Sequence, residues 1–208
     1  MESSGMEHIA TIMTSFFTLV SGIIVAWFTY NQKTKDKMTS LKIEQIKVEN
    51  EDKHAKNNRH IAMIYGELYR VLNKADADRC FILQPHPEGR YSLVSVVFEV
   101  VSPGISEIKN NIQNLPMSEI AGFSNELSLN YEMRFDNIEE QIKDNRTKSL
   151  MRLSGATNIV MIQLVNSKEH WNGTLITERI ASNPFSEEAV NAMKSTATTI
   201  QYILPPIV

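Results

Sequence analysis

Cysteine is almost absent from this 208-residue chain, and so is any excess of positive charge. Cys80 is the only cysteine, which excludes an intramolecular disulfide and a zinc site built from several cysteines. The net charge of -3 leaves no basic footprint, so we expect no nucleic-acid partner. The five histidines lack metal-ligand spacing, and nucleophile elbows, phosphate-binding loops, Rossmann glycines and HExxH motifs are missing. We therefore expect no catalytic residue, no metal, no cofactor and no enzymatic activity.

Charged residues are also missing from the stretch Ile9 to Tyr30. As a helix with about 1.5 Å rise per residue it would cover roughly 33 Å, enough to cross a hydrocarbon core of about 30 Å. A cleaved export signal would have a basic start and a shorter apolar run, and a helix of a soluble core would rarely be this long. The pattern predicts a permanent membrane anchor, whose main apolar and aromatic residues are Ile9, Phe16, Phe17, Ile23, Ile24, Trp27 and Tyr30.

Lysine and arginine are unevenly distributed around this predicted span. None precedes it, whereas Lys33, Lys35, Lys37 and Lys42 follow it. Because basic residues favour the cytoplasmic side, we expect residues 1–8 outside and the rest of a single-pass protein at the cytoplasmic face of the inner membrane. The same lysines are placed to contact anionic lipid.

Small residues recur at every fourth position of the span, at Thr14, Thr18, Gly22 and Ala26. This spacing lets membrane helices approach closely, so it favours a homo-oligomer formed through this face. The alternative is that small residues are simply common in membrane spans.

Residues 31–59 form a charged connector that is free of proline and glycine up to residue 58. Lysine alternates there with acidic residues, which is typical of a solvated helix with exposed charge pairs. We expect a helical stalk, with a charged mobile linker as the alternative. Gln45 and Asp52 occupy would-be core positions, so the coiled-coil signal is weak.

Residues 60–208 predict an α+β domain, with an antiparallel sheet flanked by helices. A first helix, His60 to Lys74, has an apolar stripe. Strands at Cys80 to Gln84 and Leu93 to Val101 should form a hairpin across a proline-rich turn, where we expect His86 to be exposed.

A polar middle region should be helical. The isoleucines of residues 105–115 predict one helix that Pro116 stops, and further helical pieces should follow, with apolar positions at Ile120, Leu127, Ile138, Ile142 and Leu150. Gly155 should end this region.

A second hairpin is predicted from residues 159–165 and 173–180, with Trp171 in its turn either packing on the hairpin or contacting a partner. The last helix should begin at the N-cap Ser186 with a Phe185–Val190 staple. Its buried stripe is expected at Val190, Met193, Ala197, Ile200 and Leu204.

Three stretches of this domain carry a family resemblance: IYGELYRVLNKADADRCFIL, IVMIQLVNSKEHWNGTLITERI and SEEAVNAMKSTATTIQYIL. They resemble the entry helix and first strand, the closing hairpin and the terminal helix of a GAF domain, a relative of the PAS fold. The resemblance implies a cavity beneath the helical middle, which the family uses for small ligands or replaces by dimerisation. We therefore expect a membrane-tethered module that senses a small ligand or recruits a protein partner; which residues would bind the ligand is unknown.

Particular ligands of the family are poorly matched here. Asn73-Lys74, Phe135 and Glu139-Glu140 imitate the cyclic-nucleotide pattern only loosely, with a different acidic residue and spacing. Cys80 lies in an apolar strand and is expected to be a core residue rather than a chromophore-linking thiol. The group Asp76, Asp78 and Arg79 is either a charged cluster at the mouth of the sheet or an ordinary polar turn.

A second, architectural resemblance is to the holins of T-even bacteriophages, which combine one N-terminal span, a connector and a compact α+β domain. It implies an oligomerising lysis protein as the alternative function. The predicted cytoplasmic domain and the very short N-terminus depart from that family, in which the globular domain is periplasmic.

Overall fold

The computed structural model describes residues 27, 44, 47, 51–53, 55–87 and 92–207. The chain divides into two units, Met1–Ala55 and Lys56–Val208. The predicted anchor, association face and juxtamembrane lysines lie outside the described residues, apart from Trp27, which is helical and 60% exposed. Of the predicted stalk, residues 44, 47, 51–53 and 55–59 are described, and they are helical. No helix within the described part of the chain is long and apolar enough to cross a membrane.

The second unit is built on one six-stranded antiparallel sheet. Its strand order is β3-β2-β1-β6-β5-β4. The strands are β1 (Arg79–His86), β2 (Leu93–Val101), β3 (Leu115–Pro116), β4 (Glu132–Phe135), β5 (Asn158–Val165) and β6 (Trp171–Arg179). The β1–β2 and β5–β6 hairpins confirm the two predicted from the sequence, and β1 also pairs with β6 at the centre of the sheet.

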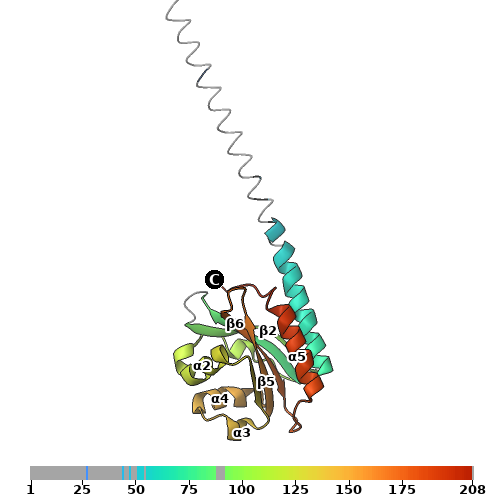
Figure 1. Cartoon of the computed structure of the whole chain (residues 1–208), viewed down its shortest axis with the longest axis vertical. Coiled ribbons are helices and arrows are strands. Elements are labelled where there is room, and N and C mark those ends of the chain that lie inside the picture. Colours follow the sequence, from blue (N-terminus) through green and yellow to red (C-terminus); the bar gives the residue numbers. More distant parts are fainter. Residues whose placement is uncertain are drawn as a thin grey trace, which may run out of the picture. The chain divides into compact units, whose positions relative to one another are not determined.

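Helices cover both faces of this sheet (Figure 1). On one face lie the helix of residues 56–74 and α5 (Glu187–Ile200), which are joined by a hydrogen bond from Arg70 Nη2 to Thr196 Oγ1 at 2.9 Å. The other face carries an insert between β2 and β5. Its helices are η1 (Lys109–Asn111), η2 (Met117–Ile120), α2 (Ala121–Leu129), α3 (Ile138–Gln141) and α4 (Asn145–Ser154).

Two hydrophobic cores result, one on each face of the sheet. The first is shared by the 56–74 helix, α5 and side chains such as Cys80 and Ile82; the second lies under the insert and includes Phe81 and Leu83. Strand alternation separates these neighbours onto opposite faces. A register shift opposite Ile82 and Leu83 changes the face of the even-numbered residues of β2, so Val94 and Val96 lie in the second core whereas Phe98 and Val100 lie in the first.

The terminal helix forms as its sequence signals predict. The Ser186 hydroxyl accepts a hydrogen bond from Ala189 N at 3.2 Å, and Phe185 and Val190 are buried in the same core. The helix ends at Ile200, and Leu204 is buried after it rather than within it. Gly155, at φ +70°, closes α4 in the left-handed conformation that glycine adopts most readily.

The insert departs from the sequence prediction in two places. The expected helix over residues 105–115 is wrong: only η1 forms there, because Ile112 O accepts from Val96 N at 2.9 Å and the Glu99 carboxylate accepts from Ile108 N. Strand β4 lies where only helices were expected, because residues 132–135 pair with β5 along the sheet edge.

The prediction that His86 is exposed is wrong. The residue is buried, with 8% of its surface exposed, and its Nε2 lies 2.8 Å from Ser95 Oγ. The β1–β2 ladder continues as far as the His86–Leu93 pair, which places this ring inside the hairpin instead of in the turn.

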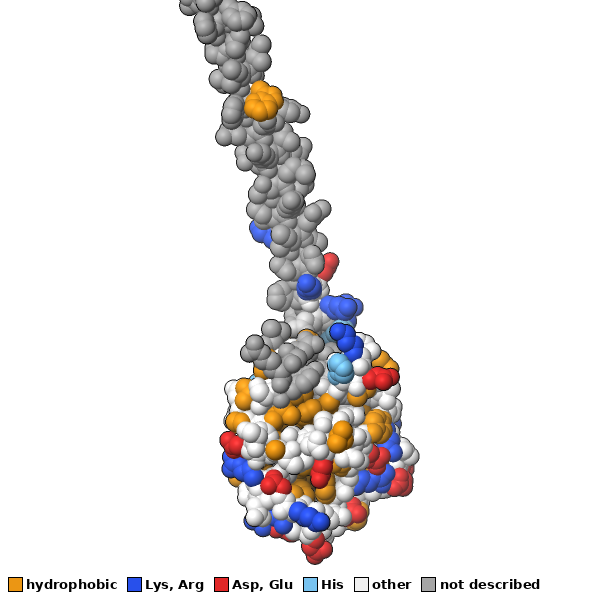
Figure 2. Space-filling view, turned by 60° about the vertical axis from the view of Figure 1, so that its left-hand side comes forward, with side chains coloured by type: hydrophobic (Ala, Val, Ile, Leu, Met, Phe, Trp, Pro, Cys, Tyr) orange, Lys and Arg blue, Asp and Glu red, His pale blue; other side chains and the backbone are white. Residues whose placement is uncertain are grey.

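Acidic and basic side chains lie beside one another on the face of the second unit that Figure 2 shows. Exposed ion pairs tie parts of the insert together, such as Arg146 with Glu119 at 2.6 Å and Arg152 with Glu139 at 2.5 Å. Exposed pairs of this kind contribute little to stability, so the two cores hold the fold together.

Candidate ligand cavity

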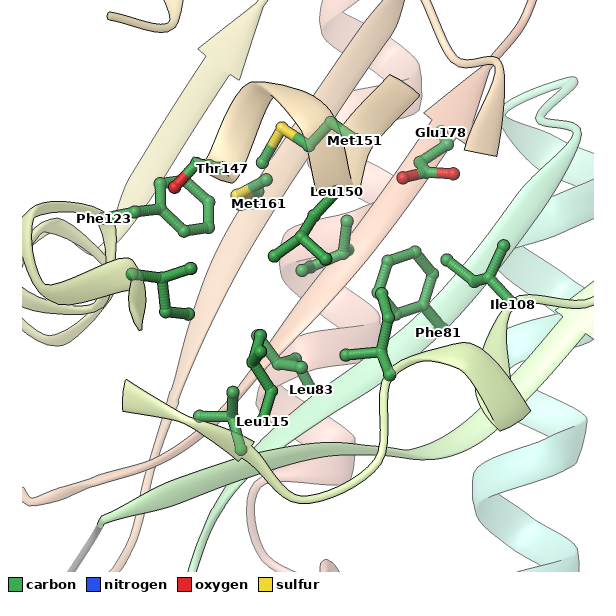
Figure 3. A pocket seen from close by; sticks show the side chains of 14 residues that line it. Phe81, Leu83, Ile108, Leu115, Phe123, Thr147, Leu150, Met151, Met161 and Glu178 are labelled. Carbon is green, nitrogen blue, oxygen red and sulfur yellow. The ribbon is translucent and has the colours of Figure 1, made fainter. Parts of the chain in front are cut away.

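A cavity of about 50 Å³ lies between the sheet and the insert (Figure 3). Its sheet side is formed by Phe81 and Leu83 of β1, Met161 of β5 and Ile176 of β6. These residues share a face because side chains two apart on a strand point the same way, and the paired strands are in register. The sequence-based expectation of a cavity beneath the helical middle is met.

The insert covers the cavity from the opposite side. Leu150 and Met151 come from α4, Phe123 from α2 and Ile108 from the loop before η1. Helix α4 begins at its N-cap Asp144, whose Oδ2 accepts a hydrogen bond from Thr147 N at 2.7 Å. Thr147 is one of two polar side chains in the lining, and its hydroxyl is already bonded to the same Asp144 oxygen.

Glu178 of β6 is the other polar group of the lining and its only ionisable side chain. It is 3% exposed and lies at one end of the cavity, near Phe81 and Ile108 (Figure 3). Its carboxylate oxygen Oε2 lies 2.5 Å from Arg79 Nη1. Arg79, on β1, is 2% exposed.

Arg79 joins three strands and the insert in one buried network. Its Nε lies 3.2 Å from Glu99 Oε1 on β2, close enough for an ion pair although the geometry makes no hydrogen bond. Its Nη2 donates to Ser106 O at 2.7 Å, and Nη1 reaches Ser154 O at 3.3 Å. We call Arg79, Glu99 and Glu178 the charge triad.

The charge triad contains two carboxyl groups and one guanidinium. Burial raises the pKa of Glu178 above its ordinary value, the nearby Glu99 adds to this rise, and Arg79 and Ser154 oppose it. Desolvation penalises the charged form, so the protonated form of Glu178 is favoured relative to an exposed glutamate.

The sequence-predicted charged cluster is only partly formed. Arg79 is buried within the sheet rather than at its mouth, Asp76 is exposed, and Asp78 Oδ2 accepts from Ile180 N at 2.7 Å. Sequence reasoning missed both partners of Arg79. A usable signal was present, because Glu99 interrupts the apolar run VVFEVV and Glu178 the run LITERI.

Cys80 faces away from the cavity and into the first core, as expected of a core residue. It is fully buried, and its Sγ lies 3.6 Å from Thr177 Oγ1. Burial raises the pKa of the thiol to about 12. Trp171 was expected in the turn but is the first residue of β6, and it packs in the second core, where it is 8% exposed and donates from Nε1 to Thr174 Oγ1 at 3.1 Å.

The loose cyclic-nucleotide pattern is not assembled. Asn73 and Lys74 end the helix on the first-core face, whereas Phe135 packs against the second core. Glu139 is exposed and bound to Arg152. Among the described residues, no three His, Cys, Asp or Glu side chains are grouped to hold a metal ion.

A groove of about 290 Å³ is lined by residues 122, 123, 126, 135 and 141–144. Phe123 lines both this groove and the cavity. The groove is more polar, since Glu126, Lys143 and Asp144 contribute to it.

The antiparallel sheet, its central first and last strands and the cavity under the insert together define a GAF-like fold. The GAF3 domain of Slr1393 from Synechocystis, in its photoproduct state, is 11% identical with a TM-score of 0.57, over 68% of this chain and 90% of that one. The PixJ GAF domain of Thermosynechococcus elongatus is 13% identical with a TM-score of 0.58, over 71% and 85%.

A third similar structure is a domain of a putative two-component sensor histidine kinase from Sinorhizobium meliloti, 14% identical with a TM-score of 0.52, over 67% of this chain and 87% of that one. No protein-family profile matches this chain, and no curated protein matches it. At these identities the likeness establishes the fold alone.

Proposed function

We propose that this chain is a non-enzymatic, membrane-tethered sensor whose GAF-like domain binds a small ligand in the cavity beneath the insert. The observation that supports this most is the composition of the cavity, which is apolar except for Thr147 and one buried carboxyl group, Glu178. Apolar pockets with a few placed polar groups are typical of ligand sites.

The size of the cavity limits what it holds in this conformation. Its 50 Å³ is well below the roughly 300–1,000 Å³ of drug-sized ligand pockets. A compact ligand fits the cavity as it stands, and a larger one requires side chains of its lining to move; Phe123, which also lines the groove, is one candidate. A chromophore linked through cysteine is disfavoured, because Cys80 is the only cysteine of the chain and belongs to the opposite core.

The membrane anchor in this proposal is inferred from the sequence alone. The uncharged stretch Ile9 to Tyr30 and the lysines after it favour an anchor with the domain on the cytoplasmic side of the inner membrane, where it would recruit a partner or form a homo-oligomer. Membrane fractionation of the full-length chain and a reporter fused after Val208 test this. Recovery in the soluble extract, or a reporter active only outside the cytoplasm, would contradict it.

Ligand binding is tested on the full-length chain in nanodiscs by thermal shift with a metabolite collection. A ligand at 100 times its dissociation constant adds about 2.7 kcal/mol to the stability. Leu150→Phe fills the cavity from α4 and should abolish the shift. The matched variant Leu153→Phe changes the same helix at a residue that is 62% exposed and outside the cavity, so it should keep the shift. No stabilising compound, or equal behaviour of the two variants, would count against ligand binding.

The holin-like alternative is supported by the order of span, connector and domain in the sequence. It predicts that induction of the full-length chain in bacteria collapses the membrane potential abruptly. Growth without such a collapse would leave the sensor as the better explanation.

A further inference from the structure

The charge triad is buried and contains more acidic groups than basic ones. Glu178 faces Arg79 of β1, Glu99 of β2 and Ser154 at the end of α4. Of the described residues, Arg79 is the only cation paired with either carboxyl group. With both glutamates ionised the triad carries one net negative charge, and a buried charge without compensation is costly.

The two glutamates differ in how fully their oxygens are used. Both oxygens of Glu99 accept from Ile108 N, at 2.9 and 3.1 Å, and Oε2 also accepts from Lys109 N at 2.7 Å. Glu99 does not line the cavity, whereas Glu178 does. Glu178 is therefore the member of the triad that a molecule in the cavity can reach.

We propose that the cavity selects a compact apolar molecule carrying one cationic amine, whose ammonium group pairs with Glu178. The ammonium supplies the missing positive charge, so that two cations then face two carboxylates. The remaining lining is apolar apart from Thr147, whose hydroxyl is already bonded to Asp144. Such a lining suits a ligand with a short alkyl or aryl body. This inference rests on the proposed ligand-binding function and names its ligand class.

Proton balance follows from the same geometry. Burial and the nearby Glu99 raise the pKa of Glu178, so this carboxyl group is protonated more easily than an exposed glutamate. An ammonium ion beside it favours the ionised form, so any proton held by Glu178 would leave to solvent as the amine binds. Amine affinity should therefore rise with pH for as long as the amine itself stays protonated.

The probes are straight-chain primary amines from propylamine to hexylamine, each compared with the alcohol of the same length. Binding is measured by calorimetry on the full-length chain in nanodiscs. A hydrogen bond to a charged group should favour the amine by about ten- to a hundred-fold over its alcohol. Glu178→Gln should reduce this ratio to near one. Glu99→Gln removes the excess negative charge of the triad but keeps the carboxyl group that lines the cavity, so it should lower the ratio less than Glu178→Gln does.

A second measurement does not depend on any variant. Calorimetry in phosphate and HEPES, whose ionisation enthalpies differ and neither of which is a primary amine, should show up to one proton released per bound amine and none per bound alcohol. If Glu178→Gln fails to fold, judged by Trp171 fluorescence, the amine-to-alcohol affinity ratio and the number of protons released by the wild type still test amine selection.

The outcomes separate this inference from the proposed function. Equal binding of amines and alcohols without proton release, or equal loss of selectivity in the two glutamine variants, overturns amine selection. The ligand-binding proposal still stands if some other compound gives a thermal shift that Leu150→Phe abolishes. If no compound gives a shift sensitive to Leu150→Phe, both ideas fail.

Discussion

Arg79→Met is the change that should damage this fold most through electrostatics. It leaves Glu99 and Glu178, which are 8% and 3% exposed, without their cation, and it also removes the donors to Ser106 O and Ser154 O. Breaking a buried ion pair from one side costs about 3–5 kcal/mol, a large share of a typical stability of about 5–15 kcal/mol. With a urea slope of about 2 kcal/mol per molar, the unfolding midpoint should fall by roughly 2 M.

Trp171 is the natural reporter for this experiment, because it is buried beside β5 and the chain has only two tryptophans. In a Trp27→Phe background its fluorescence follows unfolding of the domain within the full-length chain in detergent. Arg134→Met is the control, since it removes a partly exposed arginine that pairs with Glu132 and Glu187. The midpoint of this control should move little.

Removing the whole charge triad provides a further check. Adding Glu99→Gln and Glu178→Gln to Arg79→Met leaves no unpaired buried charge, so much of the lost stability should return. If Arg79→Met shifts the midpoint no more than Arg134→Met, or if the triple variant is less stable than Arg79→Met alone, the argument from the buried charges is refuted.

Three other predictions concern single side chains. Because the pKa of Glu178 is raised in the folded state, the contribution of this group to stability is largest below the ordinary carboxyl value of 4.5 and is lost as the pH rises through the folded value. Between pH 4.5 and neutrality, the free energy of unfolding of Glu178→Gln should therefore fall less than that of the wild type. Parallel pH curves for the two proteins would contradict this. Leu127→Ala, at a residue 1% exposed in α2, should cost about 2–5 kcal/mol in urea unfolding, whereas Leu129→Ala in the same helix, at 72% exposure, should change little; equal effects would place the second core elsewhere. Cys80, with its pKa raised from 9.0 to about 12, should react with iodoacetamide at least roughly a thousand-fold more slowly in the native than in the unfolded chain, and rapid native labelling would show that it is accessible.

The parts of the fold that were predictable are those encoded locally. Strand β2 was recognised with its observed bounds because LVSVVFEVV is rich in β-branched residues, and α5 because Ser186 and its acidic first turn mark a helix start. The GAF-like resemblance drew on the same local elements, and the solved structures agree with it at the level of the fold.

The insert was less predictable because distant partners decide its structure. The isoleucine spacing of residues 105–115 suits a helix, yet their backbone groups bond to Glu99 and Val96 of β2 instead. β4 is short and half-buried at the sheet edge, and its sequence EMRF alternates polar and apolar residues over only four positions, too few to identify a strand. The charge triad was missed for a similar reason, since Arg79 and Glu178 are 99 positions apart. The membrane anchor and its orientation stay predictions.

The position of β1 between β2 and β6 bears on how the protein is made. During translation β1 pairs with β2 early, but its second edge stays open until residues 171–179 have left the ribosome. Until then the nascent chain presents an apolar strand edge and a guanidinium that lacks one of its two carboxyl partners, a state prone to misassociation. A message truncated before the last strand would therefore yield a product for chaperones and proteases rather than a smaller working domain.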